Sequence, residues 1–409
     1  MSNKHVVITH GVRTAIGKIG KSLKDICDTD LATIVIDDLL NNRAKLDPEQ
    51  IDQVILGEVK QKADPANVAR VAALNAGLPE KVSCYTVNRQ CGSGLQAIID
   101  AYEMIAADEA NLIVAGGVEN MSQSVYFMRN AKKGLGNGAY SIEDSLTDGG
   151  PGAIPKERYG YHPMGITAEN LARIYGITRE QQDEFAMSSQ VKMAEAMRAG
   201  YFKEQIVPVT VRESTGTRVF DTDEHPFLSS MEKLAALKPA FQKDGTVTAG
   251  NSSGRNDGAS AVLVMSEEKM KELGYQPMAR IIGVGSSGCN PTTMGLGPVE
   301  CSKLAMRRAG ITIRDLDVIE LNEAFAAQSL AVVEEWKKLG IEEAELLEKL
   351  NPNGGAIAHG HPLGCTGSAL TVKCMYELQR RPEARYGLIT LCCAGGLGVA
   401  LVIEKCEGV

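Results

Sequence analysis

The sequence is poor in aromatic residues and has no long uninterrupted apolar segment. Aromatic residues make up 5% of the 409 residues and tryptophan occurs once, so an aromatic-rich binding surface is not expected. No apolar run approaches the ~18 residues that a membrane-spanning helix needs, so we expect no membrane partner. Acidic residues outnumber basic ones by 51 to 43, giving a net charge of −8, which argues against a nucleic-acid partner.

The ten cysteines lack the Cys-x-x-Cys spacing that is typical of zinc sites. Residues 1–10 resemble a strand and have no charged-then-apolar pattern of a secretory leader. We therefore expect free thiols, a cytoplasmic location and no disulfides. A metal site around His359, His361 and Cys365 is the weaker alternative, and we predict no metal.

Glycine is abundant, with 42 residues, and 44% of the chain is hydrophobic. This composition suits closely packed α/β layers in more than one domain. The two ends of the chain also echo each other. Residues 31–58 and 301–323 each read as a helix, an acidic turn, an apolar strand and a polar pair, and residues 91–117 and 364–396 form a second matching pair. We predict a duplicated α/β unit.

A central region of different texture separates the two halves. It is rich in Gly, Pro, Met and charged residues and contains one amphipathic helix over 178–199, with a capping box at Thr178 and Gln181. Such an insertion is typical of a segment that covers a site. The predicted division is an N-terminal half over 1–121 completed by 252–276, a loop domain over 122–251, and a C-terminal half over 277–409.

Cys91 is a candidate nucleophile because it precedes Gly-Ser-Gly and a predicted helix. A helix N-terminus stabilises a thiolate, and small residues let a substrate carbonyl reach the backbone N–H groups. A buried inert cysteine is the alternative. His361 lies on a Gly/Pro loop that enters another helix, which suits a base able to reach a thiol. Cys392 and Cys393 end an apolar strand, and alternation allows only one to face a pocket without showing which.

Asn322 and Glu323 follow the apolar strand 317–321. Ligand-contacting groups gather at the carboxyl ends of strands in open α/β sheets. Asn322 is expected to hold a water that donates to a carbonyl oxygen. Capping of the helix that follows is the alternative role for this side chain.

These segments closely resemble the signature blocks of the thiolases, in the thiolase order. The blocks cover residues 87–95, 322–326, 354–367 and 391–398. Residues 161–170 and 246–254 resemble the acyl-pocket loop and the pantetheine-contacting segment. The resemblance extends over essentially the whole chain. It implies the thiolase fold, with two duplicated βαβαβαββ halves in five layers and an inserted loop domain.

The resemblance also implies a role for each site residue. Cys91 takes the acyl group, His361 activates it, and Cys392 exchanges a proton with the methyl carbon of the second acetyl-CoA. Asn322, through a water, forms one oxyanion site with His361, and the backbone N–H groups of Cys91 and Ala394 form the other. The resemblance thus selects Cys392 over Cys393.

The same likeness implies contacts with the acyl group and with coenzyme A. The residues concerned are Leu146, His162, Met164, Ser230, Phe241, Ala249, Ser253, Met294 and Phe325. Two positions depart from the family pattern. Ala394 stands where glycine is usual, so that its methyl group could crowd the oxyanion site or require another φ. Pro163 splits the usual His-Met pair and affects the placement of His162.

The predicted activity is that of an acetyl-CoA C-acetyltransferase, which condenses two acetyl-CoA reversibly to acetoacetyl-CoA and CoA. The thioesters are substrates, and no cofactor is expected. A degradative 3-ketoacyl-CoA thiolase for longer chains is the nearest alternative. Two further alternatives are disfavoured. A decarboxylating ketosynthase needs a histidine where this chain has Asn322, and a non-catalytic CoA-binding protein does not need the full set of site residues. The assembly is expected to be a homotetramer or a homodimer.

Overall fold

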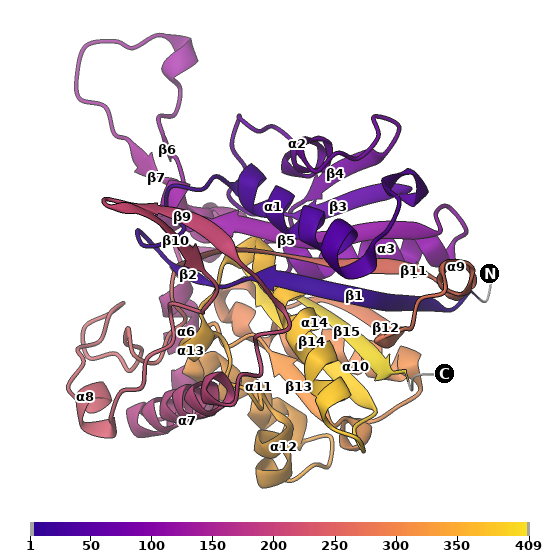
Figure 1. Ribbon diagram of the computed structural model, residues 1–409. Helices are drawn as coiled ribbons and strands as arrows, with labels where there is room; N and C mark the ends of the chain where they lie inside the picture. The colour runs from indigo at the N-terminus through magenta and orange to yellow at the C-terminus, as the bar shows by residue number, and fades with distance from the viewer. Residues whose placement is uncertain (1–3, 407–409) are drawn as a thin grey trace.

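The computed structural model describes residues 4–406. A long mixed sheet runs through the molecule (Figure 1) in the order β13-β14-β15-β12-β1-β11-β5-β3-β4. In that order the strands are Val318–Leu321, Tyr386–Cys393, Leu397–Lys405, Ala279–Gly288, Val6–Thr14, Asn256–Ser266, Leu112–Asn120, Gln53–Gly57 and Ser83–Val87. Two short strands, β2 (Gly17–Lys18) and β8 (Ile206–Val207), pair with β11 and β1.

The sheet consists of two similar halves that meet where β1 pairs with β12. That contact spans only three residue pairs, from Val6 opposite Ile281 to Ile8 opposite Ala279. In one half β3 runs parallel to β5, and β5 is antiparallel to β11. In the other, β13 runs parallel to β14, and β14 is antiparallel to β15. A single parallel bridge from Ile319 to Leu350 takes the place of β4.

Helices form three further layers. α3 (Ser93–Ala106) and α14 (Leu363–Arg380) pack against each other between the two sheet halves. α1 (Asp28–Asp37) and α2 (Val68–Asn75) cover the outer face of the N-terminal half, while α10 (Gly297–Ala309) and α11 (Ala326–Lys337) cover that of the C-terminal half. Three apolar cores fill the spaces between these layers. The predicted five-layered arrangement of duplicated halves is confirmed.

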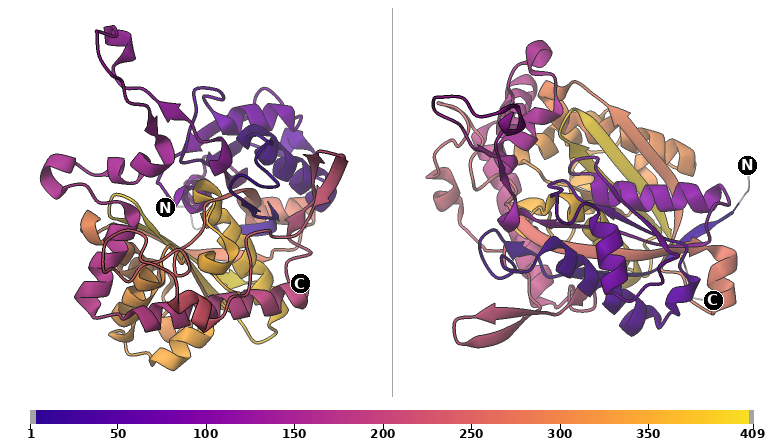
Figure 2. Two further views of the ribbon diagram at one scale, coloured as in Figure 1. Left: turned by 90° about the vertical axis from the view of Figure 1, so that its left-hand side faces the viewer. Right: turned by 90° about the horizontal axis from the view of Figure 1, so that it is seen from above.

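A large insertion follows β5 and precedes β11, and it lies along one side of the molecule (Figures 1 and 2). Its helices are α4 (Ser145–Gly149), α5 (Lys156–Tyr159), α6 (Met164–Tyr175), α7 (Arg179–Arg198) and α8 (Met231–Ala235). Four of its strands form two hairpins, β6 (Tyr126–Phe127) with β7 (Glu143–Asp144), and β9 (Val209–Glu213) with β10 (Gly216–Phe220), whereas β8 pairs with β1. The segment between β6 and β7 stands well away from the body of the molecule.

The remaining helices are short. They are α9 (Glu267–Leu273), α12 (Glu343–Lys349) and α13 (Ala356–His359). Across residues 4–406, no helix combines the length and the apolar character needed to cross a bilayer.

Local sequence signals determine the start of α7, whereas the end of β5 depends on a contact with another strand. The capping box of α7 forms as predicted: Gln181 N–H donates to Thr178 Oγ1, and the Gln181 side chain accepts from Thr178 N–H. β5 continues through Gly116 and Gly117 to Asn120. Gly116 allows this extension: a Cβ there would lie 2.1 Å from the Ser260 carbonyl oxygen on β11.

Candidate active site

Cys91 lies in a tight turn between β4 and α3. Gln90, immediately before it, has φ of 51°, a left-handed conformation that is rare for a residue with a Cβ. Ser93 stabilises the turn, because its Oγ accepts from Arg89 N–H at 2.9 Å and donates to the Gln90 carbonyl at 2.6 Å. The turn therefore presents the Cys91 side chain at the start of the helix.

Backbone N–H groups surround the Cys91 thiol. Burial raises its pKa to about 11, while hydrogen bonds from the N–H groups of Ala394 and Cys91 and the charge of Lys60 oppose the increase. These are the same two N–H groups that the resemblance assigned to an oxyanion site. Both act on the pKa of the thiol, so they lie near the sulfur to which an acyl group would be bonded.

Glycines bring the two central helices into close contact near their starts. A Cβ on Gly94 of α3 would lie 2.5 Å from the Gly364 carbonyl oxygen, and a Cβ on Gly367 of α14 would lie 2.3 Å from Leu95 N. Side chains at these positions would push the helices apart. The crossing therefore puts the Cys91 turn and the His361 loop at the same end of the central layer.

Several groups fix His361 in place. Its backbone N–H donates to Asn256 Oδ1 at 3.0 Å, and its Nδ1 lies 2.7 Å from Thr366 Oγ1. Its Nε2 lies 3.5 Å from Asn322 Nδ2. Burial lowers the pKa of the imidazole to about 4, so it is neutral near pH 7. A neutral ring whose Nδ1–H donates to Thr366 leaves Nε2 free to accept a proton.

Asn322 is fully buried next to this ring, and its Oδ1 has no hydrogen-bond partner among residues 4–406. Its backbone N–H donates to the Thr390 carbonyl on β14, which fixes the strand end. The alternative role as a helix cap is wrong, because the N-cap of α11 is Phe325. The amide is therefore available to a water or a substrate oxygen.

Cys392 and Cys393 belong to different apolar cores. Cys392 packs with Met294 and Phe325, whereas Cys393 belongs to the central core beneath α3. Burial raises the pKa of both thiols well above the usual value. The alternation of the strand thus sends Cys392 to the side of the predicted acyl-pocket residues and Cys393 against Gly92, where an added Cβ would lie 2.7 Å from its sulfur.

Ala394 occupies its position without backbone strain. Its φ is not positive, and the left-handed conformations fall on the two glycines that follow, with φ of 91° at Gly395 and 77° at Gly396. Alanine is therefore compatible with a backbone N–H that points toward Cys91. The conformational cost considered from the sequence does not arise.

Four of the predicted acyl-pocket residues gather near Cys392. Met294 and Phe325 are core members of one apolar cluster with it, and Met164 packs against that cluster. The Phe241 ring meets Phe325 edge to face, with centroids 6.0 Å apart. A Cβ on Gly165 would lie 2.2 Å from the Phe241 ring, so the glycine makes room for it.

The other predicted contacts are more dispersed. Ser253 adjoins the site, because its N–H donates to the Ala324 carbonyl at 3.0 Å. His162 Nε2–H donates to the Tyr159 carbonyl at 2.7 Å, and the buried Nδ1 has no partner among residues 4–406. Ser230 caps α8, Ala249 is exposed in a turn, and Leu146 is half-buried on α4. Among residues 4–406, Leu146 is not one of the partly buried apolar residues that pack against the cluster around Cys392.

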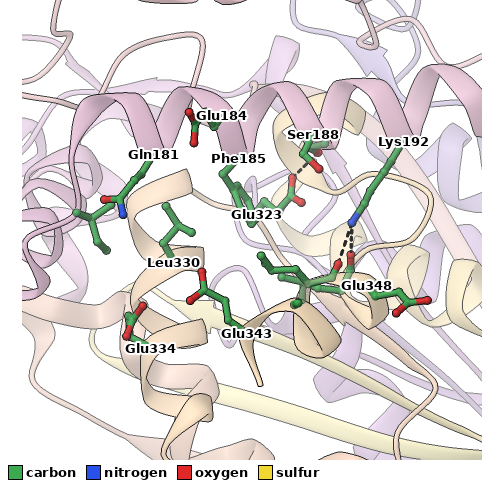
Figure 3. Close-up of a pocket in the computed structure, with 15 residues that line it drawn as sticks. Gln181, Glu184, Phe185, Ser188, Lys192, Glu323, Leu330, Glu334, Glu343 and Glu348 are labelled. Atoms are coloured by element: carbon green, nitrogen blue, oxygen red, sulfur yellow. Dashed lines mark hydrogen bonds between the residues drawn. The ribbon is translucent and has the colours of Figure 1, made fainter. Parts of the chain in front are cut away.

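A pocket of about 530 Å³ lies behind the Asn322 loop, between α7, α11 and α12 (Figure 3). Glutamates and apolar side chains line it, and Lys192 crosses one end with its Nζ bonded to the Leu347 and Leu350 carbonyls. Glu323 forms part of its wall and accepts from Ser189 Oγ at 2.7 Å. Neither Cys91 nor His361 lines this pocket, so it is separate from the predicted site.

Sequence inspection missed groups that hold the predicted residues in place. Glu119 is buried at the end of β5 and accepts from the backbone N–H groups of Val59, Lys60 and Gly364. Asn256 lies more than one hundred residues from His361 in the chain. A charged residue at the end of an apolar strand was the available signal for Glu119, but the signal does not identify its partners.

Comparison with known proteins assigns the chain to a family. Residues 6–268 match the model of the thiolase N-terminal domain and residues 275–405 that of the C-terminal domain. An acetyl-CoA acetyltransferase of Syntrophomonas wolfei is 47% identical over 98% of this chain and 99% of the relative. The crystal structure of the Bacillus anthracis acetyl-CoA acetyltransferase has a TM-score of 0.92 at 44% identity, covering 98% and 99% of the two chains.

The structure of human mitochondrial 3-ketoacyl-CoA thiolase is also similar, with a TM-score of 0.92 at 39% identity and 99% coverage of both chains. The folds, the domain models and the relatives all agree over nearly the full length. The chain therefore belongs to the thiolase family.

Proposed function

We propose that the protein is an acetyl-CoA C-acetyltransferase that condenses two acetyl-CoA molecules to acetoacetyl-CoA and CoA, and also catalyses the reverse. The observation that supports this most is the convergence of Cys91, Cys392, His361 and Asn322 at one end of the central helix layer. The family membership and the names of the similar acetyltransferases agree with this activity.

In the first half-reaction, His361 Nε2 takes the proton of the Cys91 thiol. The thiolate attacks the carbonyl carbon of acetyl-CoA, and the C–S bond to CoA breaks. CoA leaves with the proton, and the acetyl group remains on Cys91 as a thioester. A neutral imidazole is the form that this step needs, which agrees with the lowered pKa of His361.

In the second half-reaction, the Cys392 thiol gives its proton to neutral His361, and the resulting Cys392 thiolate removes a proton from the methyl group of a second acetyl-CoA. The resulting carbanion attacks the acetyl carbon on Cys91, a C–C bond forms, the C–S bond to Cys91 breaks, and the Cys91 thiolate takes the proton from His361. Two oxyanion sites stabilise the negative charge on oxygen. The N–H groups of Cys91 and Ala394 form one, while Asn322 and His361 form the other; one such donor is typically worth about 3–4 kcal/mol.

We infer a preference for short acyl chains from the packing around Cys392. Met294, Phe325 and Cys392 are at most 8% exposed and belong to one apolar cluster. Phe241 lies against Phe325 at its edge. A long acyl chain would have to displace these side chains, whereas an acetyl group needs little space.

The test is the ratio of kcat/KM for thiolytic cleavage of acetoacetyl-CoA, 3-ketohexanoyl-CoA and 3-ketooctanoyl-CoA. A strong preference for acetoacetyl-CoA supports the short-chain assignment. Equal or better cleavage of the longer substrates would assign the protein to the degradative 3-ketoacyl-CoA thiolases. Failure to cleave any of them would support a CoA-binding protein without thiolase activity.

The hairpin insertion supports a further proposal about assembly. Tyr126, Leu135 and Ile142 lie on or between β6 and β7 and are 55–69% exposed. We propose that residues 122–251 form the loop domain over the site and that this hairpin joins copies of the chain into a homotetramer. Removing residues 128–141 and measuring mass in solution tests this, since a tetramer should fall to a dimer. Ten free cysteines support a cytoplasmic location. The proposed acyl-CoA chemistry supports a role in fatty acid metabolism.

A further inference from the structure

Lys60 lies just beyond the carboxyl end of β3, on a segment that is fixed to the active site. The backbone N–H groups of Val59 and Lys60 donate to the Glu119 carboxylate at 3.0 and 2.9 Å. The same carboxylate accepts from Gly364 N–H at 2.8 Å, at the start of α14. The position of Lys60 is therefore tied to the loop that carries His361.

The segment is also bonded to the turn that carries Cys91. The Val59 carbonyl accepts from Asn88 Nδ2 at 3.2 Å, and Asn88 Oδ1 accepts from Gln90 N–H at 3.0 Å. Lys60 is thus held between the Cys91 turn and α14. No part of the mechanism described above uses its side chain.

The ammonium group of Lys60 is directed toward α4. Its Nζ donates to the Ser145 carbonyl at 2.5 Å. A Cβ on Gly149 would lie 1.9 Å from this Nζ, so a glycine at position 149 leaves the space that the ammonium occupies. The side chain is half-buried, which limits the water that screens its charge.

We propose that Lys60 is a positioning residue for the acyl-transfer reaction: its ammonium fastens α4 to the site and places a positive charge that stabilises the thiolate of Cys91. The proposal rests on the proposed role of Cys91 as nucleophile. Lys60 does not touch the reacting atoms, and acts through Cys91.

Charge effects at the site agree with this role. Burial raises the pKa of Cys91, and Lys60 opposes that increase, whereas the carboxylate of Glu119 adds to it. Burial lowers the pKa of Lys60, and the charges of Glu119 and Cys91 favour its ammonium form. A cation is useful here because His361 is neutral and has no hydrogen bond to the Cys91 sulfur in the described part of the chain.

Other ionisable groups also surround this pair and set the background for any pH profile. They come from several elements: Glu119 on β5, Asp144 before α4, Arg255 before β11, His361 before α14, and Cys392 and Cys393 on β14. Replacing Lys60 changes none of these side chains.

The experiment measures the rate of alkylation of Cys91 by iodoacetamide between pH 6 and pH 10, read by mass spectrometry of the Cys91 peptide on the full-length protein. Iodoacetamide is uncharged, so its rate follows the thiolate fraction. Lys60→Met should slow alkylation about 3- to 10-fold below pH 9, as expected for an increase in the pKa of Cys91 of about half to one unit. Lys60→Arg should restore most of the rate.

Lys62→Met is the matched control. Lys62 is two residues away and pairs with Asp28, not with Cys91. It should leave the Cys91 profile unchanged. If Lys60→Met does not fold, Gly149→Ala gives an independent test, because its methyl group displaces the ammonium without removing it, and alkylation should slow in the same direction.

Coincident alkylation profiles for the wild type and a folded Lys60→Met variant would overturn the proposal. Separate steady-state kinetics that show a rise in KM, together with unchanged alkylation, would overturn it too and leave Lys60 only as a support for α4. The alkylation measurement itself needs no substrate. Failure of the proposed function is detected separately, by acetylation or turnover that persists in Cys91→Ser.

Discussion

The starts of α3 and α14 meet at one glycine each but carry different chemistry. Gly94 and Gly367 are the crossing glycines, and each approaches the backbone of the other helix. Three residues before them stand Cys91, in the turn that precedes α3, and Gly364, in the first turn of α14. Six residues before Gly367 stands His361, the imidazole of the site. Duplication therefore supplied two equivalent loops, and the side chains of each loop became specialised for a separate task.

The strand ends beside these helices differ in the same way. Asn322 follows β13 and faces His361, whereas Gly57 ends β3, where a Cβ would lie 2.3 Å from the Ser93 carbonyl carbon. In the proposed mechanism, the N-terminal half contributes the nucleophile and makes room for its helix. The C-terminal half would contribute the base, the amide and the second thiol. Variants on each side should separate these contributions.

The largest expected effect comes from removing the contribution of the N-terminal half. Cys91→Ser should abolish acyl-enzyme formation and lower kcat about 10⁴-fold or more, because a hydroxyl is a far weaker nucleophile than a thiolate. Incubation with acetyl-CoA followed by intact-protein mass spectrometry checks this. Cys365→Ser on α14 is the control: Cys365 is fully buried, and burial raises the pKa of its thiol to about 12. Acetylation of Cys91→Ser at the wild-type level would refute the nucleophile assignment.

Cys392→Ala should separate the two half-reactions. Without this thiol, no proton is exchanged with the methyl carbon of the second acetyl-CoA, so condensation should fall about 10³-fold. Acyl transfer to Cys91 should continue, because it needs only the nucleophile and His361. Mass spectrometry of acetyl-Cys91 and the rate of acetoacetyl-CoA formation measure the two steps. Equal losses in both steps would contradict this separation of roles. Cys393→Ala is the control and should leave acyl transfer and condensation near wild-type rates.

Asn322→Ala should have a smaller effect, confined to one oxyanion site. We expect kcat for thiolysis to fall about 10²- to 10³-fold with little change in KM, as for the loss of a single preorganised donor. The folded state should tolerate the change, because the Asn322 Oδ1 has no partner to lose. Steady-state kinetics and a thermal unfolding curve check both expectations. A wild-type kcat would show that the Asn322 amide is not part of the oxyanion site.

Much of this site could be predicted because its signals are local. The Cys91 turn and the α7 capping box are each encoded within a few residues. The choice between Cys392 and Cys393 could not be made from alternation, because it depends on which core each side chain meets. Glu119 and Asn256 act on loops far away in the chain. The extension of β5 to Asn120 depends on its approach to β11, which no single strand pattern contains.

The smallest expected effect concerns two glutamates at equivalent strand ends. Glu323 accepts hydrogen bonds from Ser189 Oγ, Asn351 Nδ2 and Ile357 N–H. Glu58, after β3, is equally buried, but its Oε1 has no partner, and burial followed by the charges of Asp28 and Glu119 raises its pKa to about 8. The folded protein therefore binds more protons than the unfolded chain between about pH 4.5 and pH 8, so this contribution to stability is full at low pH and is lost as pH rises.

Glu58→Gln should remove that loss and raise the free energy of unfolding at pH 8.5 by on the order of 2 kcal/mol, with no gain at pH 5. Glu323→Gln should instead lower the free energy of unfolding at both pH 5 and pH 8.5. The amide group of the new glutamine would face a hydrogen-bond donor and leave buried groups unpaired, which costs about 1–3 kcal/mol. Chemical unfolding of both variants and the wild type at pH 5 and pH 8.5 distinguishes the two. If the free energy of unfolding changes between pH 5 and pH 8.5 by the same amount in Glu58→Gln and in the wild type, Glu58 is ionised in the folded state. Only a carboxyl that keeps its proton on folding makes stability fall as the pH rises.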